Sequence, residues 1–195
     1  MNSKIFNTAL VLVLLALTML GTWWMDGHRG IISTPALTHG NALSPAPQAT
    51  APAPQATLRT LDGVQQMLHD YQGKIILLNF WATWCTPCIA EWPQFINLAR
   101  ALPEDVVILA VSIDDEPARI APFMKRYAPT FRDHNNIILF HDADKSVSQD
   151  LFQTVRVPET IIITPDMTMA RKVAGLSLKW DSEDTIDYLR GLKAR

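Results

Sequence analysis

Cysteine is scarce in this sequence, and neither sign of charge dominates it. Only two cysteines occur in 195 residues, too few for a disulfide scaffold or a cysteine-rich zinc module. The 17 Lys and Arg residues oppose 19 Asp and Glu residues, and no basic run occurs. The composition therefore lacks the positive surface expected of a nucleic-acid-binding protein. Two cysteines still allow free thiols, one bridge, a redox pair or two ligands of a mixed metal site.

Residues 5–25 contain no charged side chain. As a helix this segment would be about 31 Å long, which matches the ~30 Å hydrocarbon core of a bilayer. Lys4 precedes it, and Trp23 and Trp24 lie at its far end, where interfacial aromatic residues are common. We predict that residues 1–29 form a membrane anchor with a cytoplasmic N-terminus. A cleaved signal peptide is the alternative, but the segment is long for one and lacks an Ala-x-Ala site.

Residues 30–57 contain no aromatic residue, and the hexapeptide PAPQAT occurs twice within them, at 45–50 and 52–57. A segment rich in Pro and Ala cannot bury enough surface to fold, and its prolines favour an extended chain. We predict a disordered tether that holds the following domain away from the membrane. A spacer without that role is the alternative.

Residues 58–195 alternate between short apolar runs and helical patterns, and they are long enough for one domain. The runs that predict strands are 74–82, 105–113, 137–140, 160–164 and 169–174, the last two as a hairpin. The segments with helical patterns are 62–71, 86–101, 116–127, 146–154 and 182–192. Asp181 is expected to cap the last of these helices. Helices between buried strands predict an α/β domain with a mixed sheet and with its chemistry at the carboxyl ends of the strands.

The two cysteines stand three residues apart in the motif WCTPC (84–88), between a predicted strand and a predicted helix. On a first helical turn, this spacing brings two sulfurs within reach of a disulfide. The helix dipole and unpaired amides stabilise a thiolate at Cys85, and Pro87 fits a first turn. We predict a redox pair in which Cys85 attacks and Cys88 resolves. A structural disulfide is the alternative, although so short a loop removes little unfolded-state entropy.

A metal site would need at least two more ligands beside the cysteines. His69, His134 and His141 occur singly in separate segments, as ordinary surface or core histidines do. We expect no metal and no bound cofactor, so the redox group would be the Cys85–Cys88 disulfide itself.

The motif and its flanks, NFWATWCTPCIAEWP at 79–93, resemble the thioredoxin superfamily and, within it, the membrane-anchored TlpA, ResA and CcmG (DsbE) branch. The resemblance extends from residue 58 to the C-terminus and implies a thioredoxin fold. It implies that Pro93 kinks the active-site helix, and that a cis-proline loop at Val157 and Pro158 packs against the cysteines. It also implies that residues 136–154 are the strand-helix insert of this branch.

The resemblance assigns roles around the cysteines, with one departure. Thioredoxin carries a buried aspartate six residues before its first cysteine, where this chain has Asn79, and an amide cannot accept a proton. Glu91, one turn beyond Cys88, coincides with a glutamate of the ResA and CcmG branch. It is expected to take the proton of Cys88 during resolution, unless it is a solvated helix residue. Glu159 follows Pro158 as in CcmG, and is expected to add a carboxyl group beside the cysteines or to hydrogen-bond a partner.

Trp84 is expected to cover the sulfurs and to contact partners, whereas Phe80 and Trp81 are expected in the core. The residues expected to support the site and bind substrate are Trp84, Thr86, Pro87, Val157, Pro158 and Glu159.

Members of this branch are typically reductants recharged by a membrane electron donor of the DsbD or CcdA type, and many act on apocytochrome c. The resemblance therefore implies a thiol-disulfide oxidoreductase that reduces exported proteins. It would cross the inner (cytoplasmic) membrane once and hold its catalytic domain on the periplasmic side. An anchored disulfide oxidase or isomerase is one alternative, because the same cysteines can run in reverse. A thioredoxin-fold binding module without activity is another, which an intact cysteine pair argues against. A peroxiredoxin is disfavoured because it needs no second cysteine three residues on.

Overall fold

The computed structural model describes residues 51–193. The predicted anchor (1–29) and most of the predicted linker (30–57) lie outside these residues, so both stay predictions. Within residues 51–193, no helix combines the length and the apolar character needed to cross a membrane.

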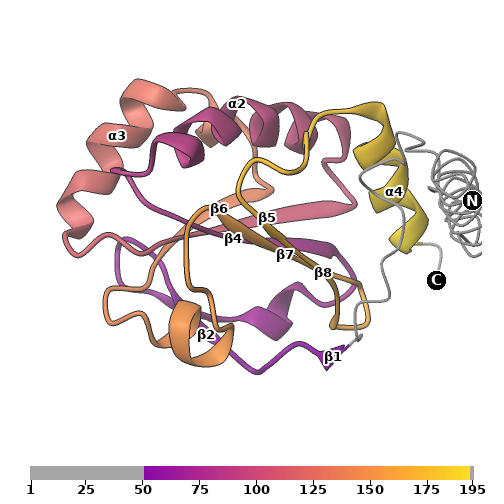
Figure 1. Ribbon diagram of the computed structural model, residues 1–195, viewed down its shortest axis with the longest axis horizontal. Helices are drawn as coiled ribbons and strands as arrows, with labels where there is room; N and C mark the ends of the chain where they lie inside the picture. The colour runs from indigo at the N-terminus through magenta and orange to yellow at the C-terminus, as the bar shows by residue number, and fades with distance from the viewer. Residues whose placement is uncertain (1–50, 194–195) are drawn as a thin grey trace, which may run out of the picture. The chain divides into compact units, whose positions relative to one another are not determined.

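A six-stranded mixed sheet forms the centre of the fold, in the order β1-β8-β7-β4-β5-β6 (Figure 1). Its strands are β1 (Ala51–Pro52), β4 (Ile75–Trp81), β5 (Val106–Ser112), β6 (Ile137–His141), β7 (Glu159–Ile163) and β8 (Thr168–Ala174). β4, β5 and β6 run parallel, whereas β7 is antiparallel to β4, β8 to β7 and β1 to β8. Every residue of β4, β5 and β7 is buried, as continuous apolar runs predict for strands covered on both faces. The α/β domain with a mixed sheet is thus confirmed.

The two faces of the sheet carry different covers (Figure 1). One is covered by the helices α2 (Thr86–Ala101), α3 (Ile120–Tyr127) and α4 (Glu183–Lys193). The other is covered by the hairpin of β2 (Thr57–Arg59) and β3 (Gln65–Met67) and by two short helices, η1 (Leu68–Tyr71) and η4 (Ser146–Leu151). The short helices η2 (Pro117–Arg119) and η3 (Phe131–Asp133) flank α3.

Alternation along β4 sends its side chains into two separate cores. Leu77 and Trp81 enter the core beneath α2, whereas Leu78 and Phe80 enter the core on the hairpin side. Successive side chains of a strand point to opposite faces of a sheet. The same alternation decides which polar side chains can lie on the side of the cysteines.

The predicted helix at 86–101 coincides with α2, but the predicted helix at 62–71 is wrong. Residues 65–67 form β3, which pairs with β2, and only residues 68–71 form a helical turn. Gly63 has a φ of 89°, which a helix does not contain. The backbone N–H of Val64 donates to the hydroxyl of Thr60 at 3.0 Å. This side-chain bond favours a hairpin turn over the helix that the apolar spacing indicated.

The domain also begins earlier than the sequence predicts. β1 pairs with β8, and Ala53 and Ala56 are buried in the core on the hairpin side. The ordered fold therefore starts no later than residue 51, rather than at residue 58. Small alanine side chains fill a core here, although the composition of the segment predicts disorder.

The predicted strand-helix insert at 136–154 is present as β6 and η4. β6 pairs with β5 and forms an edge of the sheet. η4 is a six-residue π-helix. The carboxylate of Asp142 holds its first turn, accepting the backbone N–H groups of Val147 at 3.1 Å and Ser148 at 2.8 Å.

The predicted cap of the C-terminal helix is wrong by one residue. The backbone N–H of Thr185 donates to the hydroxyl of Ser182 at 3.4 Å. Asp181 instead accepts a hydrogen bond from Asn97 of α2 at 2.9 Å. The aspartate therefore joins the segment before α4 to α2.

Candidate active site

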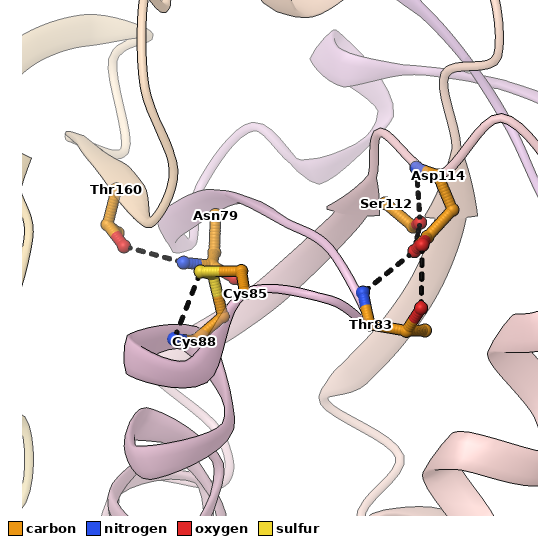
Figure 2. Close-up of a disulfide and its surroundings, with 7 residues drawn as sticks. All are labelled: Asn79, Thr83, Cys85, Cys88, Ser112, Asp114 and Thr160. Atoms are coloured by element: carbon orange, nitrogen blue, oxygen red, sulfur yellow. Dashed lines mark hydrogen bonds between the residues drawn. A yellow bond between two sulfur atoms is a disulfide. The ribbon is translucent and has the colours of Figure 1, made fainter.

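Cys85 and Cys88 lie where the chain passes from β4 into α2, as the sequence predicts. Cys85 is the N-cap residue of α2, and its Sγ accepts a hydrogen bond from the backbone N–H of Cys88 at 3.2 Å. The two sulfurs form a disulfide of 2.06 Å (Figure 2). Pro87 occupies the first turn, where its missing N–H removes no helical bond. The same N–H would stabilise a thiolate at Cys85 once the bridge is reduced.

The disulfide is buried, but the residues around it face solvent. Cys85 is 5% exposed and Cys88 is 2% exposed, whereas Trp84 is 63% exposed. Thr86 and Pro87 are exposed as well. The greater exposure of Cys85 suits the attacking thiol, and the open Trp84 ring suits a contact with another protein.

The aromatic residues at the end of β4 are in the core, as predicted. Phe80 and Trp81 are both buried. Trp81 packs edge-on against Trp92 of α2, with ring centroids 5.1 Å apart. Pro93 follows within α2, and the helix continues past it to Ala101.

The peptide bond between Val157 and Pro158 is cis, as the resemblance implies. Pro158 directly precedes β7, whose first residues pair with Phe80 and Asn79 near the carboxyl end of β4. Val157 packs against the core that contains both cysteines. The cis-proline loop therefore lies at the same end of the sheet as the disulfide.

Asn79 is buried in β4, where thioredoxin has its aspartate. Its Nδ2 donates a hydrogen bond to Thr160 Oγ1 at 2.9 Å (Figure 2). Asn79 and Thr160 are directly paired residues of β4 and β7. This position holds a neutral amide bound to a neutral hydroxyl, so proton transfer needs another group.

Glu91 is the buried carboxyl group on the cysteine helix. It lies one turn beyond Cys88, is 2% exposed, and its Oε1 accepts a hydrogen bond from the indole N–H of Trp180 at 2.9 Å. Its Oε2 is buried and has no hydrogen-bond partner among the described residues. Burial raises the pKa of Glu91 to about 7, against the opposing effect of the Trp180 bond. The alternative of a solvated glutamate is wrong, and a carboxyl group with this pKa can exchange protons at neutral pH.

Glu159 lies on the other side of the sheet from the cysteines. It is the first residue of β7 and is paired with Phe80, which points into the hairpin-side core. Its Oε2 accepts a hydrogen bond from Thr154 Oγ1 at 2.6 Å and pairs with Lys172 Nζ at 3.0 Å. The expectation of a carboxyl group beside the cysteines is wrong, because strand alternation turns this side chain away from α2. Glu159 instead ties the segment after η4 to β8.

A buried carboxylate that the sequence analysis missed, Asp114, holds the loop before Cys85 (Figure 2). Its Oδ2 accepts the backbone N–H of Thr83 at 3.0 Å and the hydroxyl of Ser112 at 2.7 Å. Its Oδ1 accepts the hydroxyl of Thr83 at 2.7 Å. Thr83 is two residues before Cys85, so these bonds fix the backbone that leads into Cys85. The signal in the sequence was a polar pair, Asp114 and Asp115, directly after a buried strand.

Groups that could bind a metal are dispersed in the described part of the chain. Residues 51–193 contain no group of three or more His, Cys, Asp or Glu side chains suited to a metal ion. The cysteines are joined to each other, and His141 Nε2 lies 2.7 Å from the backbone oxygen of Asp114.

A disulfide across the N-terminus of a helix, next to a cis-proline loop on a mixed sheet, defines a thioredoxin-like protein of the Cys-x-x-Cys class. Residues 49–172 match the AhpC/TSA family, and the chain belongs to this family. Its relatives named ResA place it with the TlpA, ResA and CcmG-like proteins of the thioredoxin superfamily, and structural neighbours share its fold. The thioredoxin fold that the motif implied is therefore confirmed.

The chain is 37% identical over 125 residues to the thiol-disulfide oxidoreductase ResA of Oceanobacillus iheyensis, covering 64% of this chain and 58% of that protein. It is 32% identical over 119 residues to ResA of Bacillus subtilis, covering 60% and 63%. The chain thus spans less than two thirds of the length of these relatives. The solved structure of MTB dsbF has a TM-score of 0.60 and 26% identity, over 72% of this chain and 98% of that chain.

Replacing Asp114 with alanine is expected to lower the free energy of unfolding by about 3 kcal/mol, because half-buried Thr83 and buried Ser112 would lose their shared acceptor. Urea unfolding of the oxidised protein measures this loss. Asp115→Ala is the matched control, since Asp115 is exposed and pairs with Lys145 at the surface, where ion pairs contribute little. Equal effects of the two variants would show that the Asp114 contacts do not support the loop.

Proposed function

We propose that this protein is a thiol-disulfide oxidoreductase that reduces disulfides of exported proteins through Cys85 and Cys88. The observation that carries the proposal is the disulfide at the N-terminus of α2, with Cys85 Sγ on a backbone N–H. Relatives that bear the name thiol-disulfide oxidoreductase ResA support the same activity.

The reaction starts from the reduced protein. The Cys85 thiolate attacks a substrate disulfide, so that a bond forms from Cys85 Sγ to one substrate sulfur while the other leaves as a thiolate. Cys88 then gives its proton to Glu91 and attacks Cys85 Sγ. The Cys85–Cys88 bond forms, the mixed disulfide breaks, and the substrate leaves with both sulfurs reduced. Two electrons pass to the substrate, and the oxidised product is the form with the Cys85–Cys88 disulfide, which is the form in the structure.

The proposed location in the cell rests on the sequence before the described residues. The uncharged segment at 5–25 and the Pro/Ala-rich segment after it support a single-pass protein of the inner membrane with a periplasmic catalytic domain. A reductant in an oxidising compartment needs a continuing source of electrons. A membrane donor of the DsbD or CcdA type meets that need, and apocytochrome c is the substrate class that the resemblance to ResA and CcmG favours.

The cysteine variants test the activity directly. Cys85→Ser is expected to abolish reduction of a model protein disulfide, because the attacking sulfur is gone. Cys88→Ser is expected to accumulate mixed disulfides, because the resolving sulfur is gone, and mass spectrometry of these adducts identifies partners. An unaltered reduction rate in Cys85→Ser would contradict the proposed function.

The reduction potential decides the direction of the reaction. Equilibration of the full-length chain with glutathione or dithiothreitol, followed by Trp fluorescence, is expected to give a value well below about -200 mV, as for a reductant. A value of about -120 mV would be that of a strong oxidant. The protein would then be an anchored oxidase or isomerase, which is the alternative function.

Replacing Glu91 with glutamine is expected to slow resolution by at least about tenfold just above pH 7. With a pKa of about 7, Glu91 is ionised above that pH and can accept the proton of Cys88. Below pH 7 the wild-type carboxyl group is itself protonated, and at high pH Cys88 ionises unaided, so the two proteins should converge at both ends. Single-turnover rates across pH measure the effect, and a defect independent of pH would make Glu91 a structural residue.

A further inference from the structure

Trp180 is held on α2 at three points, although it belongs to the loop between β8 and α4. Its indole N–H donates to Glu91 Oε1 at 2.9 Å, and its backbone N–H donates to Gln94 Oε1, also at 2.9 Å. Its ring packs against Phe95, with centroids 5.3 Å apart. The residue is fully buried. These contacts fix the orientation of the indole, and therefore the direction of its N–H.

Only one oxygen of the Glu91 carboxylate has a hydrogen-bond partner among the described residues. Oε1 takes the indole N–H, whereas Oε2 is buried without a hydrogen-bond partner among the described residues. A buried polar atom without a partner is rare in folded proteins and calls for an explanation. Cys88, one turn earlier on the same helix, is a buried sulfur that gains a proton whenever the bridge is reduced.

We propose that Trp180 is a positioning residue for the resolving step: its indole N–H fixes one oxygen of Glu91 so that the other is free to take the proton of Cys88. The inference rests on the proposed function, because resolution is a step of that reaction. Cys88 Sγ–H gives its proton to Glu91 Oε2, and the resulting thiolate attacks Cys85 Sγ. The substrate sulfur that leaves carries away the electron pair of the broken mixed-disulfide bond.

The charged side chains that flank Trp180 and those of the cis-proline loop are engaged elsewhere or exposed. Lys179 and Asp181 flank Trp180, but Lys179 is exposed and Asp181 accepts a hydrogen bond from Asn97. In the cis-proline loop, Arg156 is exposed, and Glu159 is turned to the other face of the sheet with Lys172. Burial and the Trp180 bond are thus the two influences on the pKa of Glu91, the first raising it and the second lowering it.

Loss of the indole N–H is expected to raise the pKa of Glu91. A hydrogen bond to the ionised carboxylate favours that form, so its removal raises the pKa of Glu91 further. In Trp180→Phe the carboxyl group would stay protonated at neutral pH and could not accept a proton. The midpoint of the pH profile of resolution is expected to move up by about one pH unit.

The experiment uses the full-length chain with two readouts across pH. The first is the single-turnover rate of reduction of a model disulfide, and the second is the carboxyl band of Glu91 in infrared difference spectra, with Glu91→Gln as the reference. Trp81→Phe is the matched control: Trp81 is also buried, but its indole N–H has no hydrogen-bond partner among the described residues. Trp180→Phe should shift both midpoints upward, and Trp81→Phe should shift neither.

A second replacement separates the N–H from the volume of the ring. Benzothienylalanine at position 180 keeps the shape of tryptophan but lacks its N–H, and it should reproduce the shift of Trp180→Phe without a packing defect. In a Glu91→Gln background, Trp180→Phe should leave the pH profile unchanged. Unshifted midpoints in both Trp180 replacements, or equal shifts in Trp81→Phe, would overturn the proposal. An active Cys85→Ser would instead overturn the proposed function, and the infrared titration would still report on the bond.

Discussion

Burial of β4 along its whole length is the constraint on which the site depends. The strand ends among closely packed side chains, so polar groups there need partners within the protein. Asn79 donates a hydrogen bond to Thr160, and Thr83, in the loop that follows the strand, donates its backbone N–H to the carboxylate of Asp114. These bonds give α2 a fixed starting point. The disulfide at its first turn is therefore presented by a rigid backbone, which leaves little conformational entropy to lose when a substrate sulfur binds.

The cysteines and the ion pair of Glu159 lie on opposite faces of the sheet. The cysteines, Glu91 and Trp180 lie on the α2 side, in the core that contains the largest aromatic cluster. Glu159 and its ion pair lie on the hairpin side, where they join β8 to the segment after η4. Glu159 is paired with the charged Lys172, whereas Glu91 accepts a hydrogen bond from a neutral indole on Oε1, and its Oε2 has no hydrogen-bond partner among the described residues. The sheet thus separates Glu91, the proposed acid-base group, from the ion pair of Glu159 with Lys172.

Local patterns in the sequence predict most of this site, whereas contacts between distant segments escape them. The apolar run of β4 and the WCTPC motif are enough to place Cys85 at a helix N-terminus, because both the strand and the cap are set by neighbouring residues. The partnership of Glu91 with Trp180 joins residues far apart in the chain, and no periodicity marks it. The helix predicted at 62–71 is wrong for a related reason: a local helical pattern is present, but pairing of β3 with β2 overrides it. The face of Glu159 depended on the register of β7 against β4, which the sequence pattern left open.

The state of Glu91 links the stability of the fold to its redox chemistry. Its pKa in the folded protein, about 7, is above the ordinary value of 4.5, so the folded state holds a proton at pH values where the unfolded chain has released it. The stabilising contribution of the protonated group is present at low pH and is lost as the pH rises through about 7. In the proposed mechanism, resolution needs the ionised carboxylate of Glu91, which is the form that burial disfavours. The hydrogen bond from Trp180 lowers the free energy of that form, and it does so without bringing a second charge into the core. A lysine at the same place would ionise Glu91 permanently and leave a weaker base, so a neutral donor is the partner that suits a carboxyl group required to take up and release protons near neutral pH.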